Sequence, residues 1–151
     1  MMLVRGDMTV AEEVDFLGPP AKRKRGAPER AAQTAVVAYL RQALPPGSIV
    51  AAVKNEHGAR AKTEGARKRF GAKRRAEGVV GGFPDLVICL PGGKAVFLEL
   101  KAPKTGRISD AQRGRHAELR ALGFDVAVAT SIETAELALR ALGVPLKATA
   151  G

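Results

Sequence analysis

Apolar residues are spaced first with a helical period and then with a strand-like one. Between Pro28 and Pro45 the apolar side chains recur mostly at intervals of three and four residues, among strong helix formers, which predicts a helix. Pro28 suits the first turn of such a helix, and Glu29 favours the positive end of its dipole. Residues 49–53 form a short apolar run bounded by turn residues, and this run predicts a strand.

A β-hairpin is predicted further along the chain. Two strand-like apolar runs, residues 84–90 and 94–101, are separated only by Pro91-Gly92-Gly93, which is a strong turn sequence. The later periodic segments predict a helix at 109–122, a strand at 124–129 and a helix at 132–142.

The order of these elements predicts the fold class. It reads helix, three strands, helix, strand, helix (αβββαβα), and it sets the hairpin beside a strand–helix–strand crossover. We therefore expect an α/β domain with a mixed β-sheet flanked by helices. This domain should span residues 28–143, with a flexible N-terminal arm at 1–27 and a C-terminal tail at 144–151.

Composition narrows the class of protein. The 151 residues suffice for one domain. No apolar stretch approaches the roughly 18 residues that span a bilayer, so we expect no membrane association and a cytoplasmic protein of a bacterium or phage. The one cysteine, Cys89, excludes a disulfide framework and a cysteine-based zinc cluster. Because it lies in an apolar run, we expect Cys89 to be a small buried hydrophobe.

Positive charge is concentrated in one segment. Lys and Arg total 25 and Asp and Glu total 15, so the net charge is 25 − 15 = +10, which favours a polyanionic partner. Residues 54–77 are interpreted as a basic insertion, either a loop or a loosely packed surface helix. Within residues 54–75, nine cations are opposed by Glu56 and Glu64 (9 − 2 = +7). We expect contacts with DNA phosphates, with a plain solvated surface as the alternative. The nine cations are Lys54, Arg60, Lys62, Arg67, Lys68, Arg69, Lys73, Arg74 and Arg75.

Candidate catalytic residues lie on the predicted hairpin. Side chains alternate along a strand, so Glu99 and Lys101 share a face at the end of an apolar run. A two-residue turn would place Asp85 opposite Leu100, whereas a three-residue turn with Gly93 in the left-handed conformation would place Asp85 opposite Glu99. We expect an irregular turn, or a bend at the proline before Asp85, that brings the two carboxylates together.

Paired carboxylates at this position indicate a metal site. Two adjacent carboxylates repel each other, and a divalent cation that prefers oxygen ligands removes the repulsion. We expect Mg²⁺ or Mn²⁺ held by Asp85, Glu99 and the backbone carbonyl of Leu100, with several waters retained. One water could attack phosphorus, while Lys101 orients it or stabilises the developing charge. The competing interpretation is an exposed ion pair between Glu99 and Lys101.

These residues resemble a known nuclease signature. Pro84-Asp85 and Glu99-Leu100-Lys101 together fill the PD-(D/E)xK pattern completely. The surrounding segments resemble the VRR-NUC branch of that superfamily over roughly residues 28–142, although Asn55-Glu56-His57 stands where an Asn-Gly pair is common in relatives. The segments that carry the resemblance are Glu29 with Gln33, Lys54-Asn55-Glu56-His57-Gly58, Gly81-Gly82-Phe83-Pro84-Asp85 and Ser109-Asp110-Ala111-Gln112.

The resemblance implies a fold, an activity and two further site residues. The fold would be restriction-endonuclease-like, and the activity metal-dependent endonucleolytic cleavage of DNA, often branched, flapped or Holliday-junction DNA, by a homodimer. An acidic residue of the first helix near the metal would be Glu29, and a Gln of the second helix beside the catalytic residues would be Gln112. Without the resemblance, Glu29 is equally explained as a first-turn acid and Gln112 as an exposed helix residue.

Other interpretations stay open at this point. The chain could be a catalytically inactive DNA-binding module of the same fold, or a basic RNA-associated protein; either would bind nucleic acid without metal-dependent cleavage. His57 and His116 could be general bases or metal ligands, but two lone histidines are more often structural or solvent-facing. His116 follows Gln112 by four residues on the same helix face, so it could lie near the site.

Overall fold

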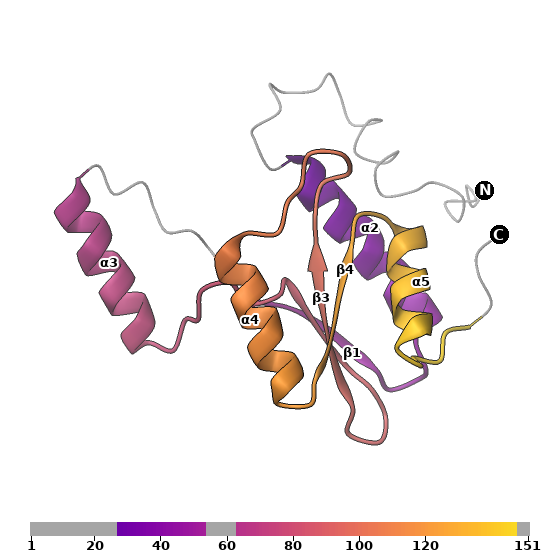
Figure 1. Ribbon diagram of the computed structural model, residues 1–151. Coiled ribbons are helices and arrows are strands. Elements are labelled where there is room, and N and C mark those ends of the chain that lie inside the picture. The colour runs from indigo at the N-terminus through magenta and orange to yellow at the C-terminus, as the bar shows by residue number, and fades with distance from the viewer. Residues whose placement is uncertain (1–26, 54–62, 148–151) are drawn as a thin grey trace, which may run out of the picture.

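The structure of the protein, a computed structural model, describes residues 27–53 and 63–147 (Figure 1). Helices and strands alternate over most of this length. In chain order the elements are α2 (Ala27–Ala43), β1 (Ile49–Ala52), α3 (Glu64–Ala76), β2 (Leu86–Cys89), β3 (Ala95–Leu100), α4 (Asp110–Ala121), β4 (Asp125–Ala129) and α5 (Ile132–Ala141).

The four strands form one mixed sheet in the order β1-β2-β3-β4. Strand β2 pairs antiparallel with both β1 and β3, whereas β4 runs parallel to β3 after the crossover through α4. The predicted class, a mixed β-sheet flanked by helices, is therefore confirmed. The predicted order αβββαβα is incomplete, because α3 lies between β1 and β2 and the described order is αβαββαβα.

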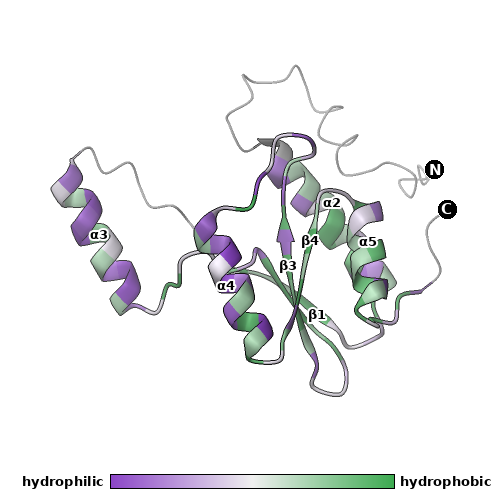
Figure 2. Ribbon diagram, viewed as in Figure 1, coloured by the Kyte–Doolittle hydropathy of each residue, from purple (hydrophilic) through white to green (hydrophobic). Residues whose placement is uncertain are grey.

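Part of the predicted basic insertion at residues 54–77 forms helix α3, which agrees with the alternative of a loosely packed surface helix. Thr63 caps the helix by accepting a hydrogen bond from Ala66 N at 3.1 Å, and Lys68 pairs with Glu64 at 3.2 Å one turn away. No residue of α3 is buried. The helix stands clear of the sheet in Figure 1 and is mostly hydrophilic in Figure 2. Such a helix has no apolar period, so its sequence resembles that of a loop. Residues 54–62 lie outside the described part of the chain.

Helices α2 and α5 cover one face of the sheet and form the main core. Every second residue of β2 and β3 points into this layer, as period-two alternation requires. Val36 and Leu40 of α2 and Leu139 of α5 are fully buried against those strands. This core supports the β2–β3 hairpin on the face that α2 and α5 cover.

Helix α4 covers only part of the opposite face. Phe97 of β3 makes edge-to-face contacts with Phe83 and Phe124, each at 5.3 Å between ring centroids, and Leu119 of α4 packs on the same cluster. The prediction that Cys89 is buried is wrong: Cys89 is exposed, and its partner across the strand pair, Ile49, is 61% exposed. The reason is that the described helix on this face packs over β3 and β4 and leaves β1 and the end of β2 uncovered.

The predicted ends of the last two helices agree closely with the structure. Ser109 caps α4 and Ser131 caps α5, each through a capping box. Gly123 follows α4 with a φ of +94°, the left-handed conformation that ends a helix. None of the described helices is long and apolar enough to cross a membrane.

The ends of the domain differ in part from the prediction. The N-terminal arm predicted at 1–27 lies, apart from its last residue, outside the described residues. The C-terminal tail predicted at 144–151 begins too early. Val144 is 3% exposed within the main core, and Lys147 N donates to Ala43 O at 2.8 Å. The Gly and Pro around Val144 end the helix but do not end the packed domain.

Candidate active site

The turn between β2 and β3 sets the position of the two candidate carboxylates. Leu90 N donates to Lys94 O at 2.8 Å across the three-residue turn 91–93, and both glycines of the turn have positive φ, +90° and +85°. The β2–β3 register keeps this pairing, so its continuation places Asp85 opposite Glu99. The expected three-residue turn is thereby confirmed, and the two carboxylates share one face of the sheet.

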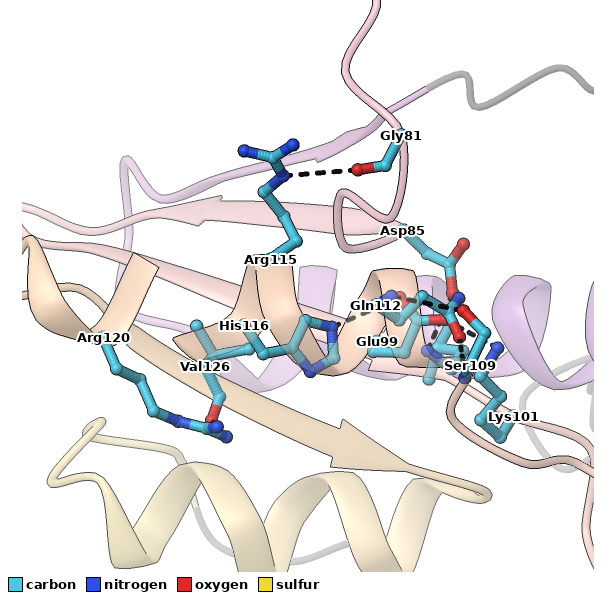
Figure 3. Close-up of polar contacts among 11 residues, drawn as sticks. Gly81, Asp85, Glu99, Lys101, Ser109, Gln112, Arg115, His116, Arg120 and Val126 are labelled. Carbon is cyan, nitrogen blue, oxygen red and sulfur yellow. Dashed lines mark hydrogen bonds and ion pairs between the residues drawn. The ribbon is translucent and has the colours of Figure 1, made fainter. Parts of the chain in front are cut away.

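Glu99 is the most deeply buried charged side chain of this site. It is 1% exposed, on the α4 side of β3. Its Oε1 accepts hydrogen bonds from Lys101 Nζ at 2.9 Å and from Gln112 Nε2 at 2.7 Å, as Figure 3 shows. The structure therefore brings three of the predicted catalytic residues, Glu99, Lys101 and Gln112, into direct contact.

Asp85 approaches Glu99 from the preceding strand. Its Oδ2 accepts a hydrogen bond from Leu100 N at 2.8 Å, which ties the side chain to the end of β3 (Figure 3). Asp85 also acts electrostatically on Glu99, because its negative charge is one of the causes that raise the Glu99 pKa. The carbonyl of Leu100, predicted as a metal ligand, stays a prediction.

Burial perturbs the acidity of Glu99. The pKa of Glu99 is raised from 4.5 to about 7, and removal from water is the largest cause. The hydrogen bond and charge of Lys101 oppose the rise, and the charge of Asp85 adds to it. A buried carboxyl group next to a second carboxylate is hard to ionise, and a nearby cation would stabilise its charged form. Mg²⁺ is commonly held by one or two carboxylates with waters retained, so Asp85 and Glu99 fit Mg²⁺ or Mn²⁺.

Glu29 forms no three-residue metal-binding group with this pair, and its role near the metal stays a prediction. Its side chain is exposed in the first turn of α2. Among the described residues, no three His, Cys, Asp or Glu side chains lie together in a way that could hold a metal ion. The position of Glu29 is explained by the helix dipole, which favours an acidic residue in the first turn.

Gln112 both caps α4 and contacts Glu99, because it lies in the first turn of that helix. Its Oε1 accepts from Ser109 N at 3.0 Å, and its own backbone N donates to Ser109 Oγ at 3.2 Å, which completes the capping box. The amide oxygen is thus occupied by the cap, and the amide Nε2 is directed at Glu99. The helix start therefore orients the group that holds the carboxylate.

The glycines before Asp85 explain how that residue is positioned. Gly82 has a φ of +71°, and a Cβ at this position would lie 2.5 Å from Ala111 O. Arg115 Nε donates to Gly81 O at 3.3 Å from the same helix, as Figure 3 shows. Only glycine allows this close approach, so the segment that leads to Asp85 rests directly on the first turn of α4.

Six of the nine predicted DNA-binding cations lie on α3. The other three, Lys54, Arg60 and Lys62, lie outside the described residues. On α3 the cations occur on all sides of the helix, and the guanidinium of Arg74 lies 5.7 Å from the ring centroid of Phe70. The six are Arg67, Lys68, Arg69, Lys73, Arg74 and Arg75.

The sequence did not decide whether His116 lies near the candidate site. It is 3% exposed, and its Nε2 lies 3.9 Å from Glu99 Oε2. Its spacing of four residues from Gln112 was the available signal, because both side chains project from one face of α4. His57 lies outside the described residues.

Comparisons with known proteins bear on the family and the fold of this chain. The sequence matches the VRR-NUC domain over residues 32–133. A solved structure described as a VRR_NUC domain protein is 21% identical, with a TM-score of 0.56 over 75% of this chain and 85% of that chain, which shows a common fold. Another, described as a VRR_NUC domain, is 20% identical with a TM-score of 0.48 over 75% and 95%. No curated protein matches the chain.

Proposed function

We propose a function for this chain from one premise: it belongs to the VRR-NUC domain family, which its sequence matches over residues 32–133. A domain of this family is of the nuclease type and acts on DNA. The finer proposal is that the chain is an endonuclease that hydrolyses DNA phosphodiester bonds with Mg²⁺ or Mn²⁺. The observation that carries it is the buried Glu99 beside Asp85, with Lys101 Nζ 2.9 Å from Glu99 Oε1.

Asp85 and Glu99 would hold the cation, and the rest of the site would hold Glu99. When bound, a divalent cation supplies a water of lowered pKa and offsets charge on the phosphate. Leu100 N fixes Asp85, and Gln112 Nε2 fixes Glu99. Lys101 is 13% exposed, so its ammonium group is screened from water yet reachable by a phosphate oxygen. There it would stabilise the negative charge on the phosphoryl oxygens in the transition state.

Helix α3 would bind the DNA near this site. It contributes six Lys or Arg and one Glu within the helix, a net charge of 6 − 1 = +5, and none of its residues is buried. Contacts from such a helix go to phosphates and carry little sequence information. We therefore propose that α3 adds affinity for the DNA backbone without selecting a base sequence.

Branched, flapped or junction DNA as substrate and a homodimeric state are further parts of the proposal. Two symmetrical cuts need two active sites, which a twofold dimer supplies. We also propose a cytoplasmic setting in a bacterium or phage. The substrate, the homodimer and the cytoplasmic setting rest on the family resemblance. A cleavage assay on several DNA structures tests the preferred substrate directly.

A cleavage assay tests the proposed chemistry. The full chain is incubated with labelled duplex, flap, four-way junction and single-stranded DNA, in Mg²⁺, Mn²⁺ or EDTA. Cleavage should require the cation, and Asp85→Asn should lower the rate by about 10²–10³-fold, as expected for loss of one essential charged group. Asp125→Asn is the matched control, since Asp125 pairs with Lys94 at 3.1 Å near the opposite end of the sheet.

The outcomes separate the nuclease from the other two functions. No metal-dependent product on any substrate would refute the nuclease proposal, and binding without cleavage would identify an inactive DNA-binding module. Binding restricted to RNA would favour the RNA-associated alternative. Cleavage that persists in Asp85→Asn would refute the site assignment while leaving the activity in place.

A further inference from the structure

His116 is buried against Glu99 and faces an atom that lacks a partner. The side chain is 3% exposed and comes from the middle of α4, one turn after Gln112. Its Nε2 lies 3.9 Å from Glu99 Oε2, and within the described part of the chain neither atom has a hydrogen-bond partner (Figure 3). Buried polar atoms are nearly always paired, so two unpaired atoms that face each other need an explanation.

The hydrogen bonds of Glu99 are divided unequally between its two oxygens. Oε1 accepts from both Lys101 Nζ at 2.9 Å and Gln112 Nε2 at 2.7 Å. Oε2 accepts from no described residue. An ionised carboxylate offers about four acceptor directions, so Oε2 has capacity for both a protein donor and a cation. His116 Nε2, from α4, lies 3.9 Å from Oε2.

Resting on the metal-dependent function proposed above, we propose that His116 is a positioning residue whose neutral imidazole donates its Nε2–H to Glu99 Oε2. This hydrogen bond holds the carboxylate in place for the divalent cation. A movement of about 0.7 Å closes the gap from 3.9 Å to hydrogen-bond distance. Metal-binding carboxylates are commonly held by such outer hydrogen bonds, which fix their orientation.

The surroundings of His116 favour a hydrogen-bond donor over a metal ligand. A neutral imidazole carries one N–H, which the facing carboxylate favours at Nε2. Among the described residues His116 joins no cluster of three metal-binding side chains. It therefore acts through Glu99.

Nuclear magnetic resonance of the metal-free protein tests the contact directly. The chain has two histidines, so a long-range ¹H–¹⁵N spectrum of the full-length protein in EDTA contains two imidazoles. His57→Gln assigns them. We expect the Nε2–H tautomer at His116, with its Nε2 proton signal shifting when Mg²⁺ is added. The Nδ1–H tautomer would overturn the proposal, since Nε2 would then have no proton to donate.

Two substitutions of similar length separate the hydrogen bond from packing. His116→Gln keeps a terminal N–H donor, whereas His116→Met fills the space without one. Mg²⁺ affinity is measured by titration calorimetry, and thermal unfolding in EDTA checks that each variant is folded. His116→Met should weaken Mg²⁺ binding by about 10–100-fold, and His116→Gln should restore most of the loss.

The results distinguish this inference from the function on which it rests. Mg²⁺ affinity in His116→Met equal to that of the unmodified protein would overturn the positioning role. If the unmodified protein binds neither Mg²⁺ nor Mn²⁺, the metal-dependent function fails first, and the tautomer in EDTA still decides whether His116 contacts Glu99. If both variants unfold, the tautomer and its response to Mg²⁺ decide.

Discussion

Replacing Glu99 by Gln should stabilise the metal-free protein at alkaline pH and have little effect at acidic pH. Glu99 is 1% exposed, and burial is the largest cause of its raised pKa. Gln resembles the protonated carboxyl in shape and can accept the hydrogen bond from Gln112. The substitution therefore removes the cost of holding a buried negative charge in the absence of a cation.

The size and sign of this effect follow from the Glu99 pKa. Below pH 4.5 the carboxyl is protonated in both the folded and unfolded states, and no cost arises. Between 4.5 and about 7 the folded state binds more protons, so the free energy of unfolding falls as the pH rises, and above about 7 the loss is complete. The pKa difference is about 7 − 4.5 = 2.5, which at about 1.4 kcal/mol per pKa unit amounts to roughly 3 kcal/mol.

Urea unfolding of both proteins in EDTA, from pH 4.5 to 8.5, measures this difference. Comparing the two proteins at each pH removes the contribution of all other titrating groups. Glu64→Gln is the control for the same change of residue at a site that is 81% exposed on α3. Saturating Mg²⁺ should reverse the ranking at pH 8, since only the protein with the Glu99 carboxylate gains the full free energy of cation binding.

Two results would refute this reasoning. If Glu99→Gln is less stable than the unmodified protein at pH 8 in EDTA, then Lys101 and Gln112 more than offset the burial of the charge. If the difference does not change with pH, Glu99 titrates at its ordinary value and the site has no excess charge cost for a cation to relieve.

Three further predictions concern the glycine contact, the basic helix and the core. Gly82→Ala should lower the cleavage rate by about 10-fold or more, because its Cβ would lie 2.5 Å from Ala111 O, whereas Gly81→Ala, with nothing within 4 Å, should cleave normally in the same assay. Leu98→Ala should cost about 2–5 kcal/mol in urea unfolding because Leu98 is 0% exposed, while Leu137→Ala, at 73% exposed, should be nearly neutral. Removing three α3 charges should reduce the slope of log affinity for duplex DNA against log salt by about 2.7, measured by fluorescence anisotropy; an unchanged slope would place the DNA elsewhere. The three substitutions are Arg69→Gln, Lys73→Gln and Arg75→Gln.

The hairpin and its carboxylates were predictable because the constraints are local. The turn 91–93 contains two glycines, and only the three-residue form of the turn gives the register that sets Asp85 opposite Glu99. Alternation along β3 then places Lys101 on the same face. The serines that cap α4 and α5 were predictable for the same reason, since a cap depends on residues within one turn.

Features that depend on which helix packs over which part of the sheet were not predictable from the sequence. Cys89 lies in an apolar run, yet no described helix covers its end of β2, so it is exposed. Helix α3 is polar on all sides and gives no periodic signal. The burial of His116 depends on which face of α4 packs against β3 and β4. None of these follows from spacing alone.

The first turn of α4 helps to position both carboxylates, Asp85 and Glu99. Glu99 is held there through Gln112 Nε2, and the segment that leads to Asp85 is held there through the contact of Gly82 with Ala111. The sheet fixes the two strands, but the side chains are positioned by one helical turn rather than by the hairpin alone. That segment also joins α3 to β2, so the connection from the basic helix to Asp85 runs through residues that contact α4.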